Sequence, residues 1–400
     1  MKFLRDTLDK AKHSFEKGGK YHKYFYVFEA LDTFHFSPNT VTPARGAQVR
    51  DAVDLKRLMM TVVIAMIPCL LFGIWNVGYQ HYLALGQAAS AGDIITVGLI
   101  QVLPIVIVAY AAGGLVEVVF AIMRRHPINE GYLVTGMLIP LVMPPDIPLW
   151  QVAVASIFSV VIAKEAFGGT GMNILNVALT ARAFLYFAYP LQISGEVWTY
   201  LPAGAKTVAG YSGATPMAVA AQASTEGESV VQAFTSFGAG WGDNLYSFTN
   251  MFFGFMPGCI GETSTLMCLI GALILIVTGV GSWKIIVSVF AGALGMGAFL
   301  NLIAVNEYMA MPAYYHLVIG GLAFGAVFMA TDPVTAAQTE SGKWVYGLLI
   351  GILTVLIRVF NPAYPEGIML AILFMNVMAP LVDYMVVSAN KKRRLQRATV

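Results

Sequence analysis

The sequence predicts an all-α, polytopic membrane protein. The 400 residues are 58% hydrophobic and only 12% charged, with a mean hydropathy of +0.70. A soluble chain of this length needs more charge to cover its surface. Because a bilayer core takes roughly 20 apolar residues per helix, the chain has enough for about ten transmembrane helices. The apolar runs lie at 57–78, 94–122, 130–144, 149–167, 173–190, 263–282, 284–306, 316–331, 343–360 and 366–388.

The basic residues predict the orientation of these runs. Lys and Arg are concentrated in the N-terminal arm and in the last twelve residues. By the positive-inside bias both termini are cytoplasmic, so the number of spans is even. The basic tail is interpreted as a membrane stop and not as a nucleic-acid contact. The predicted parts are a cytoplasmic arm (1–56), a first five-helix repeat (57–190), an extracytoplasmic loop (191–262), a second five-helix repeat (263–388) and a cytoplasmic tail (389–400).

The two halves resemble each other. Val161–Phe167 is similar to Val355–Phe360, and Leu141–Asp146 is similar to Phe328–Pro333. With five spans in each half, such repeats must be inverted in the membrane. The third and eighth runs are short and end in Pro-Asp or Asp-Pro, a pattern typical of broken helices beside a central pathway. The alternative is that proline only ends each helix at the surface.

Ionisable residues within the spans are the first candidates for function, because each costs roughly 2.5–3.5 kcal/mol to insert. Glu117, Asp332 and Asp383 are all expected near the cytoplasmic end. Three carboxylates there can collect a small hard cation, which prefers oxygen ligands. Alternatively, they are solvated groups at helix ends. Arg182 is expected to pair with a carboxylate or to reach the interface.

A second candidate is the hydroxyl of Thr215, within Gly-Tyr-Ser-Gly-Ala-Thr-Pro at 210–216. Gly213 and Ala214 allow a bulky partner to approach the backbone. A threonine hydroxyl can form a phosphate ester, and such an ester makes a loop the carrier of a cofactor. The alternative is an ordinary turn of small residues. The three cysteines lack CxxC spacing, so neither a zinc nor an iron–sulfur site is expected.

Several motifs, taken in their order, carry a family resemblance. They are Lys164–Gly171, Ser212–Thr215, Met329–Pro333 and Arg358–Gly367. Together they resemble the B subunit of the bacterial sodium-translocating NADH:quinone oxidoreductase, over nearly the whole chain from Arg50–Arg57 to the basic tail. The D subunit of Rnf-type ferredoxin:NAD complexes shares the threonine motif, but the long N-terminal arm favours the quinone reductase.

The resemblance implies ten helices in inverted repeats, urea-transporter-like in outline, in the bacterial inner membrane. It implies a subunit of a complex that passes electrons from NADH to ubiquinone and exports sodium. FMN would be joined by its phosphate to Thr215 by a flavin transferase, within Ser212-Gly213-Ala214-Thr215, and riboflavin would be a noncovalent cofactor. The same resemblance assigns the ion pathway to Glu117, Asp332 and Asp383, and the quinone region to Gly113, Gly114 and Glu130.

Two other classes of protein remain possible from the residues alone. One is a non-redox solute channel or transporter with inverted repeats, in which the threonine motif has no role. The other is a scaffold that only anchors further subunits, which the intramembrane carboxylates argue against. A yellow, fluorescent band that stays with the chain on a denaturing gel would distinguish the flavoprotein from both.

Overall fold

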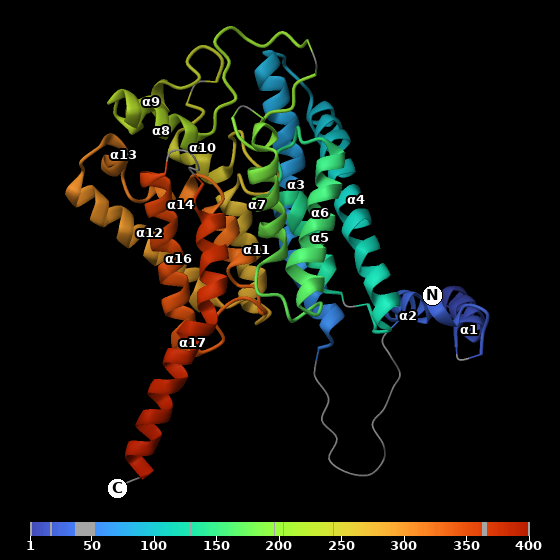
Figure 1. Ribbon diagram of the computed structural model, residues 1–400. Coiled ribbons are helices and arrows are strands. Elements are labelled where there is room, and N and C mark those ends of the chain that lie inside the picture. Colours follow the sequence, from blue (N-terminus) through green and yellow to red (C-terminus); the bar gives the residue numbers. More distant parts are fainter. Residues whose placement is uncertain are drawn as a thin grey trace.

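The computed structural model describes residues 2–16, 18–36, 53–128, 130–195, 197–202, 204–242, 244–361 and 366–398. All regular structure within these ranges is helical, which confirms the predicted all-α fold (Figure 1). Six of the described helices are long and apolar enough to cross a membrane. They are Leu55–Leu85 (α3), Ala91–Arg124 (α4), Leu149–Phe167 (α6, Leu149–Ser159, with its continuation), Trp283–Ile303 (α12), Glu340–Phe360 (α16) and Ile368–Arg397 in α17 (Ile368–Ala398).

Three shorter apolar helices accompany these spans. They are Gly131–Leu141 (α5), Val177–Ala188 (α7) and Thr265–Val277 (α11). The third apolar run thus forms a short helix, α5, as expected. The eighth run does not form one helix but divides into Tyr315–Val318 (α14), Leu322–Phe324 (α15) and a π-helix, Gly325–Met329 (η5).

Side-chain caps fix the starts of the first two long helices. Asp54 accepts a hydrogen bond from the backbone N–H of Arg57 at the start of α3. Ser90 and Asp93 form a capping box at the start of α4. Both caps satisfy N–H groups that have no partner within the first helical turn. α3 ends at Gly86 with φ 65°, a left-handed conformation that glycine adopts without strain.

Glycines allow the long helices to approach closely. A Cβ atom on Gly78 would lie 1.9 Å from the carbonyl oxygen of Ile94, and one on Gly98 would lie 1.8 Å from that of Ile74. On Gly292 of α12 it would lie 2.3 Å from the backbone of α16. Close backbone packing matters in a bilayer, because lipid is as apolar as the side chains and burial alone does not bring helices together.

A second π-helix, Val160–Lys164 (η2), continues α6 and is followed by a 3-10 turn, Glu165–Phe167 (η3). The two π-helices therefore lie in different halves of the chain. Each adds one residue per turn to an apolar helix, and such insertions are frequently found at functional sites. Gly168–Gly171 then forms a tight turn, since Gly168, Gly169 and Gly171 all have positive φ.

The N-terminal arm contains Lys2–Phe15 (α1), His22–Tyr24 (η1) and Phe25–His35 (α2). The rings of Phe15 and Phe28 stack with centroids 4.9 Å apart and hold α1 against α2. Lys56 at the start of α3 donates to the hydroxyl of Thr33 in α2. Residues 37–52 lie outside the described part of the chain, and so does the beginning of Arg50–Arg57.

The long loop between the halves contains Pro190–Gln192 (η4), Pro216–Glu226 (α8), Val230–Ser236 (α9) and Phe248–Phe253 (α10). α8 and α9 lie at one end of the molecule, and both chain termini lie toward the other (Figure 1). The end of the predicted loop, just before residue 262, packs against the end of α5. Ile260 and Gly261 donate backbone hydrogen bonds to Met143 and Leu141 at the end of α5, at 3.1 and 2.8 Å, so the chain is already buried there.

In the second half α17 extends to Ala398, so the described part of the predicted basic tail is helical. The short helix Glu307–Ala310 (α13) follows α12. Asn301 connects them, because its amide donates to the carbonyls of Met309 and Met311 at 2.6 and 2.7 Å. This polar residue thus holds a loop in place.

Candidate functional site

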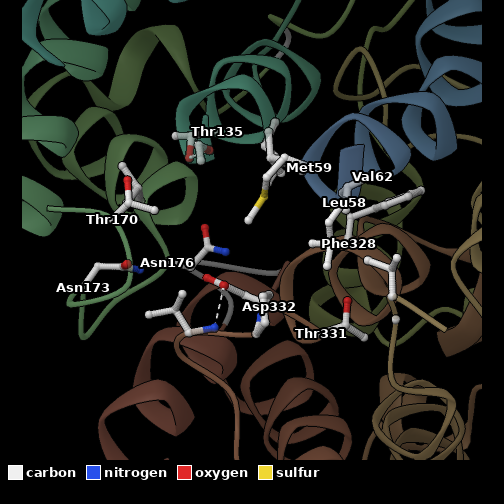
Figure 2. A pocket seen from close by; sticks show the side chains of 18 of the residues that line it. Leu58, Met59, Val62, Thr135, Thr170, Asn173, Asn176, Phe328, Thr331 and Asp332 are labelled. Atoms are coloured by element: carbon white, nitrogen blue, oxygen red, sulfur yellow. Dashed lines mark hydrogen bonds between the residues drawn. The ribbon is translucent and has the colours of Figure 1, made fainter. Parts of the chain in front are cut away.

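A cavity of about 90 Å³ lies between the two halves of the chain (Figure 2). One water molecule needs about 10–15 Å³ of such space, so the cavity can hold several. The first turns of α3, α5 and α7 line it on one side, and the segment after η5 lines it on the other. α3 begins at the end of the molecule toward which the termini lie. The polar residues that line the cavity include Thr135, Lys164, Asn173, Asn176, Thr331 and Asp332.

Asp332 is the acidic residue among the described lining. Its carboxylate accepts hydrogen bonds from the N–H of Val334 at 3.0 Å and from the hydroxyl of Thr335 at 3.1 Å. Figure 2 shows this carboxylate and the amide of Asn176 directed into the cavity. Two donors leave a carboxylate with further acceptor capacity. The arrangement offers oxygen atoms of the kind that a hard cation prefers.

Lys164 is the basic residue of the same lining, and it forms an ion pair with Glu117 of α4. Both side chains are buried, with exposed fractions of 3% and 6%. The ammonium lies 5.9 Å from the centre of the Tyr132 ring. Removing one partner of a buried pair costs about 3–5 kcal/mol, because it leaves an uncompensated charge. The predicted ion residue Glu117 therefore has a tethered cation as its neighbour.

A second ion pair lies beside the first. Arg124 donates to the buried carboxylate of Glu165 at 3.0 Å and to the carbonyl oxygen of the same residue at 2.7 Å. The adjacent residues Lys164 and Glu165 thus each form an ion pair with α4. Lys164 pairs with Glu117, and Glu165 pairs with Arg124. The two contacts fix the end of the π-helix η2 against α4.

The other predicted ion and quinone residues lie away from the cavity lining. Asp383 accepts hydrogen bonds from the N–H groups of Gln338 and Thr339, at 2.7 and 2.9 Å, just before α16 begins. Glu130 forms an ion pair with Lys56 at 2.7 Å and connects the start of α5 to that of α3. Both carboxylates therefore have structural partners, and neither is among the described lining residues of the cavity.

The predicted quinone glycines face in different directions. A Cβ atom on Gly113 would lie 1.9 Å from the hydroxyl oxygen of Tyr132, whereas one on Gly114 would come no closer than 3.9 Å to the same ring. Gly113 is buried and Gly114 is half-buried. Gly113 therefore makes room for Tyr132, whose hydroxyl donates to the carbonyl of Ala109, and Gly114 lies toward the outside of α4.

Thr215 is the N-cap residue of α8. Its hydroxyl oxygen accepts a hydrogen bond from the N–H of Ala218 at 3.3 Å. The hydroxyl of Ser212 accepts in the same way from the N–H of Ala214, also at 3.3 Å. Tyr246 donates to the carbonyl of Ala214 and fixes the loop before the helix. Thr215 is half-buried and stands at the start of a helix.

This position suits a phosphate ester. The N-terminus of a helix stabilises negative charge through its free N–H groups and its dipole. An open groove of about 520 Å³ is lined by its neighbours Ser212 and Ala214 and by Phe237 and Trp241, although Thr215 is not among the described lining residues. Aromatic rings next to the anchor provide surfaces on which a flat ring system can stack. The residues present therefore fit a phosphate-linked aromatic cofactor.

A buried polar cluster lies under Thr215. Arg182 pairs with Glu262 at 2.8 Å and with Glu366, which confirms that this arginine meets a carboxylate. Cys259 lies close enough to both carboxylates for the three residues to offer ligand atoms within 4.8 Å of one another. Thr215, Cys259, Glu262 and Glu366 all line a small space of about 20 Å³. The cluster connects the anchor loop to α7.

Sequence reasoning missed some of these residues as parts of a site. Glu262 was not among the predicted functional residues, and Lys164 and Glu366 appeared only within family motifs. The signal for Lys164 was present, because a lysine near the end of an apolar helix needs a partner. No local pattern connects Lys164 with Glu117, which precedes it by 47 residues. Residues 362–365 of the Arg358–Gly367 motif lie outside the described residues.

Comparison with known proteins places the chain in a family. The model of the NQR2, RnfD, RnfE family matches residues 42–392. A protein of Ectopseudomonas mendocina is 47% identical over 98% of this chain and 99% of its own length. One of Azotobacter vinelandii is 48% identical over the same shares. Both are named as the B subunit of Na(+)-translocating NADH-quinone reductase. With nearly its whole length matched, the chain belongs to the NQR2, RnfD, RnfE family.

Proposed function

We propose that this chain is the B subunit of a sodium-translocating NADH:ubiquinone reductase and that it carries FMN, joined through its phosphate to Thr215. The names of relatives that are 47–48% identical over nearly the full length support the assignment to this enzyme. The observation that carries the cofactor proposal is the position of Thr215, a half-buried hydroxyl at the N-terminus of α8.

The chain's own residues have two tasks in this proposal. When bound, FMN supplies the redox chemistry, and the protein determines its position and surroundings. Thr215 holds the phosphate at the helix N-terminus, where the negative charge is favoured. Ser212, Gly213 and Ala214 keep the anchor loop small enough for a flavin transferase to reach the hydroxyl. The groove beside Phe237 and Trp241 offers room for the ring.

The second task is to provide part of the sodium pathway. We propose that sodium enters from the cytoplasm at the cavity lined by Asp332 and passes Glu117. The cavity volume suits a hydrated cation. It is small for a ring system, so we expect riboflavin at a surface shared with another subunit. Asp383 is retained as a third acidic residue near the same end of the molecule. Ubiquinone is proposed to bind along α4 at Gly113 and Gly114 and toward Glu130.

The packing of the helices supports ten spans in two inverted repeats. In the first half α4 packs on α6, and α6 on α7; in the second half α12 packs on α16, and α16 on α17. α3 contacts α5 just as α11 contacts α15 and η5, and α3 meets α11 across the centre. We propose a bacterial inner-membrane protein with both termini cytoplasmic and α8 outside, joined to the other subunits of the complex.

Covalent flavin fluorescence on a denaturing gel tests the proposal. Thr215→Asn removes the hydroxyl but keeps a good N-cap, because Asn caps helices as well as Ser or Thr. The assembled complex should then be present while the fluorescence of this chain is lost. Thr225→Val, on the exposed side of the same helix, is the matched control and should keep full fluorescence. Full fluorescence in Thr215→Asn would place the flavin on another residue.

The two rival functions give different results. A D-type subunit of an Rnf complex would also carry the fluorescence, but its complex would accept electrons from ferredoxin and not reduce ubiquinone. A non-redox solute channel would show no fluorescence even in the wild type. The long N-terminal arm and the names of the full-length relatives favour the quinone reductase.

A further inference from the structure

We propose that Lys164 is a tethered cation that competes with sodium for Glu117. Its ammonium occupies the position that sodium takes beside the carboxylate, and it moves into the cavity when sodium binds. The proposal rests on the proposed role of Glu117 in the sodium pathway and adds a specificity-determining residue to it. Lys164 would set the sodium concentration at which the pathway fills.

The first support is the burial of the pair. Lys164 and Glu117 contact each other directly, and both are shielded from solvent. A carboxylate buried in a membrane protein needs a positive partner, because an unpaired charge in this environment is costly. An ionised Glu117 needs one positive charge beside it, and a lysine ammonium and a sodium ion each supply one. The two are therefore alternatives at the same position.

The second support is the relation of the pair to the cavity. Among its described lining residues the cavity includes Lys164 but not Glu117. Lys164 thus borders the cavity and contacts Glu117, so we expect a cation that comes from the cavity to meet the ammonium beside the carboxylate. The cavity also provides a place for the displaced group, since Asp332 offers a second carboxylate in its wall.

The third support is the backbone at Lys164. This residue ends the π-helix η2, and Phe328 of the second π-helix, η5, lines the same cavity from the other half. A π-helix departs from regular α-helical hydrogen bonding and is often found at functional sites. The flexible four-carbon stem of lysine can move its charge without moving the backbone.

The corresponding residue in the second half shows a different arrangement. Arg358 matches Lys164 in the two similar segments, and it is also buried. Its guanidinium donates to three backbone carbonyls, those of His316, Ile319 and Glu366, at 2.7–3.0 Å. Arg358 is thus held by three carbonyl groups and not by a carboxylate, so a sodium ion in its place would have no negative charge to neutralise. Lys164, held by a carboxylate beside a cavity, can be replaced.

The test is the half-saturating sodium concentration for ubiquinone reduction by the purified complex, together with equilibrium binding of radioactive sodium. Lys164→Gln removes the competing charge and should lower that concentration about tenfold, the change that corresponds to 1.4 kcal/mol of binding. Lys164→Arg keeps the charge and can hold the carboxylate with two N–H groups, so it should raise the concentration. Lys12→Gln, at an exposed ion pair with Glu16 in the N-terminal arm, should leave it unchanged.

Glu117→Gln and the double variant Glu117→Gln/Lys164→Gln separate the possible failures. If Lys164 competes for Glu117, the double variant should behave as Glu117→Gln does. A purely structural ion pair would lower the yield of complex in both single variants, restore it in the double variant and leave sodium saturation unchanged, which would overturn the inference. If Glu117→Gln itself leaves sodium saturation unchanged, the proposed pathway role of Glu117 is wrong.

Discussion

Replacement of Gly113 by alanine tests how the predicted quinone region is packed. The new Cβ atom would lie 1.9 Å from the hydroxyl oxygen and 2.3 Å from the Cζ atom of Tyr132, whereas ordinary contact needs about 3.5 Å. The ring therefore has to move away. Forcing extra atoms into a packed core costs about 1–3 kcal/mol, and loss of the hydrogen bond from Tyr132 to Ala109 adds about 1 kcal/mol.

The assay is the temperature at which the purified complex loses ubiquinone reduction on stepwise heating. A loss of this size should lower that temperature by at least about 2–4 °C. Because the Tyr132 ring lies 5.9 Å from the ammonium of Lys164, we also expect an altered half-saturating sodium concentration. Gly114→Ala is the matched control, since its Cβ atom would meet the same ring only at 3.9 Å.

A double-mutant cycle checks the cause. Tyr132→Leu shortens the side chain, so Gly113→Ala should cost less in its presence than in the wild type, and the two changes should not be additive. Equal effects of Gly113→Ala and Gly114→Ala, or full additivity with Tyr132→Leu, would refute the assignment of the clash to Tyr132. Alanine at either position would then act through the α4 helix itself and not through contact with Tyr132.

Two further predictions concern topology and the carboxylates. Cysteines introduced near residue 210 should react with an impermeant thiol reagent from outside the cell and those near residues 20 and 395 should not; labelling of both termini from outside would reverse the orientation. Asp332→Asn should raise the half-saturating sodium concentration without loss of complex. Asp383→Asn should mainly lower the thermal stability, because Asp383 accepts two backbone hydrogen bonds before α16. Both quantities are measured in both variants, and a loss of stability in Asp332→Asn with a change of sodium saturation in Asp383→Asn would contradict the prediction.

Hydropathy predicted the helical membrane region, because a lipid core imposes long apolar segments on any chain that crosses it. The six long helices and the short α5 follow from this constraint alone. It does not determine where a helix changes its hydrogen-bonding pattern. The π-helices η2 and η5 depend on tertiary contacts, such as those that Lys164 and Glu165 make with α4. No periodicity in the sequence indicates such an insertion.

The sequence predicted which residues belong to the candidate site better than it predicted which residues they contact. A charged residue within an apolar run is visible in the sequence, and Glu117, Asp332 and Arg182 were found in this way. Its partner is not visible, because the fold brings together residues that are far apart, such as Arg182 and Glu366, which are 184 positions apart. The partners of Asp383, just before α16, were not visible either. That the three carboxylates act together stays a prediction.

Replacement of Arg358 tests whether sodium displaces Lys164 but not the buried arginine of the second half. Its guanidinium satisfies three buried carbonyl groups at once, in a planar arrangement that a lysine ammonium does not reproduce. Each carbonyl left without a partner costs about 1–3 kcal/mol, so Arg358→Lys should strongly reduce the yield and thermal stability of the complex. In the complex that does assemble, the half-saturating sodium concentration should stay at the wild-type value, because no carboxylate loses or gains a competitor. Lys164→Arg, in contrast, should change sodium saturation with a smaller effect on stability. If Arg358→Lys instead altered sodium saturation and left stability intact, Arg358 and Lys164 would both belong to the ion pathway. The difference between an arginine bound to carbonyls and a lysine bound to a carboxylate would then not explain which of the two sodium displaces.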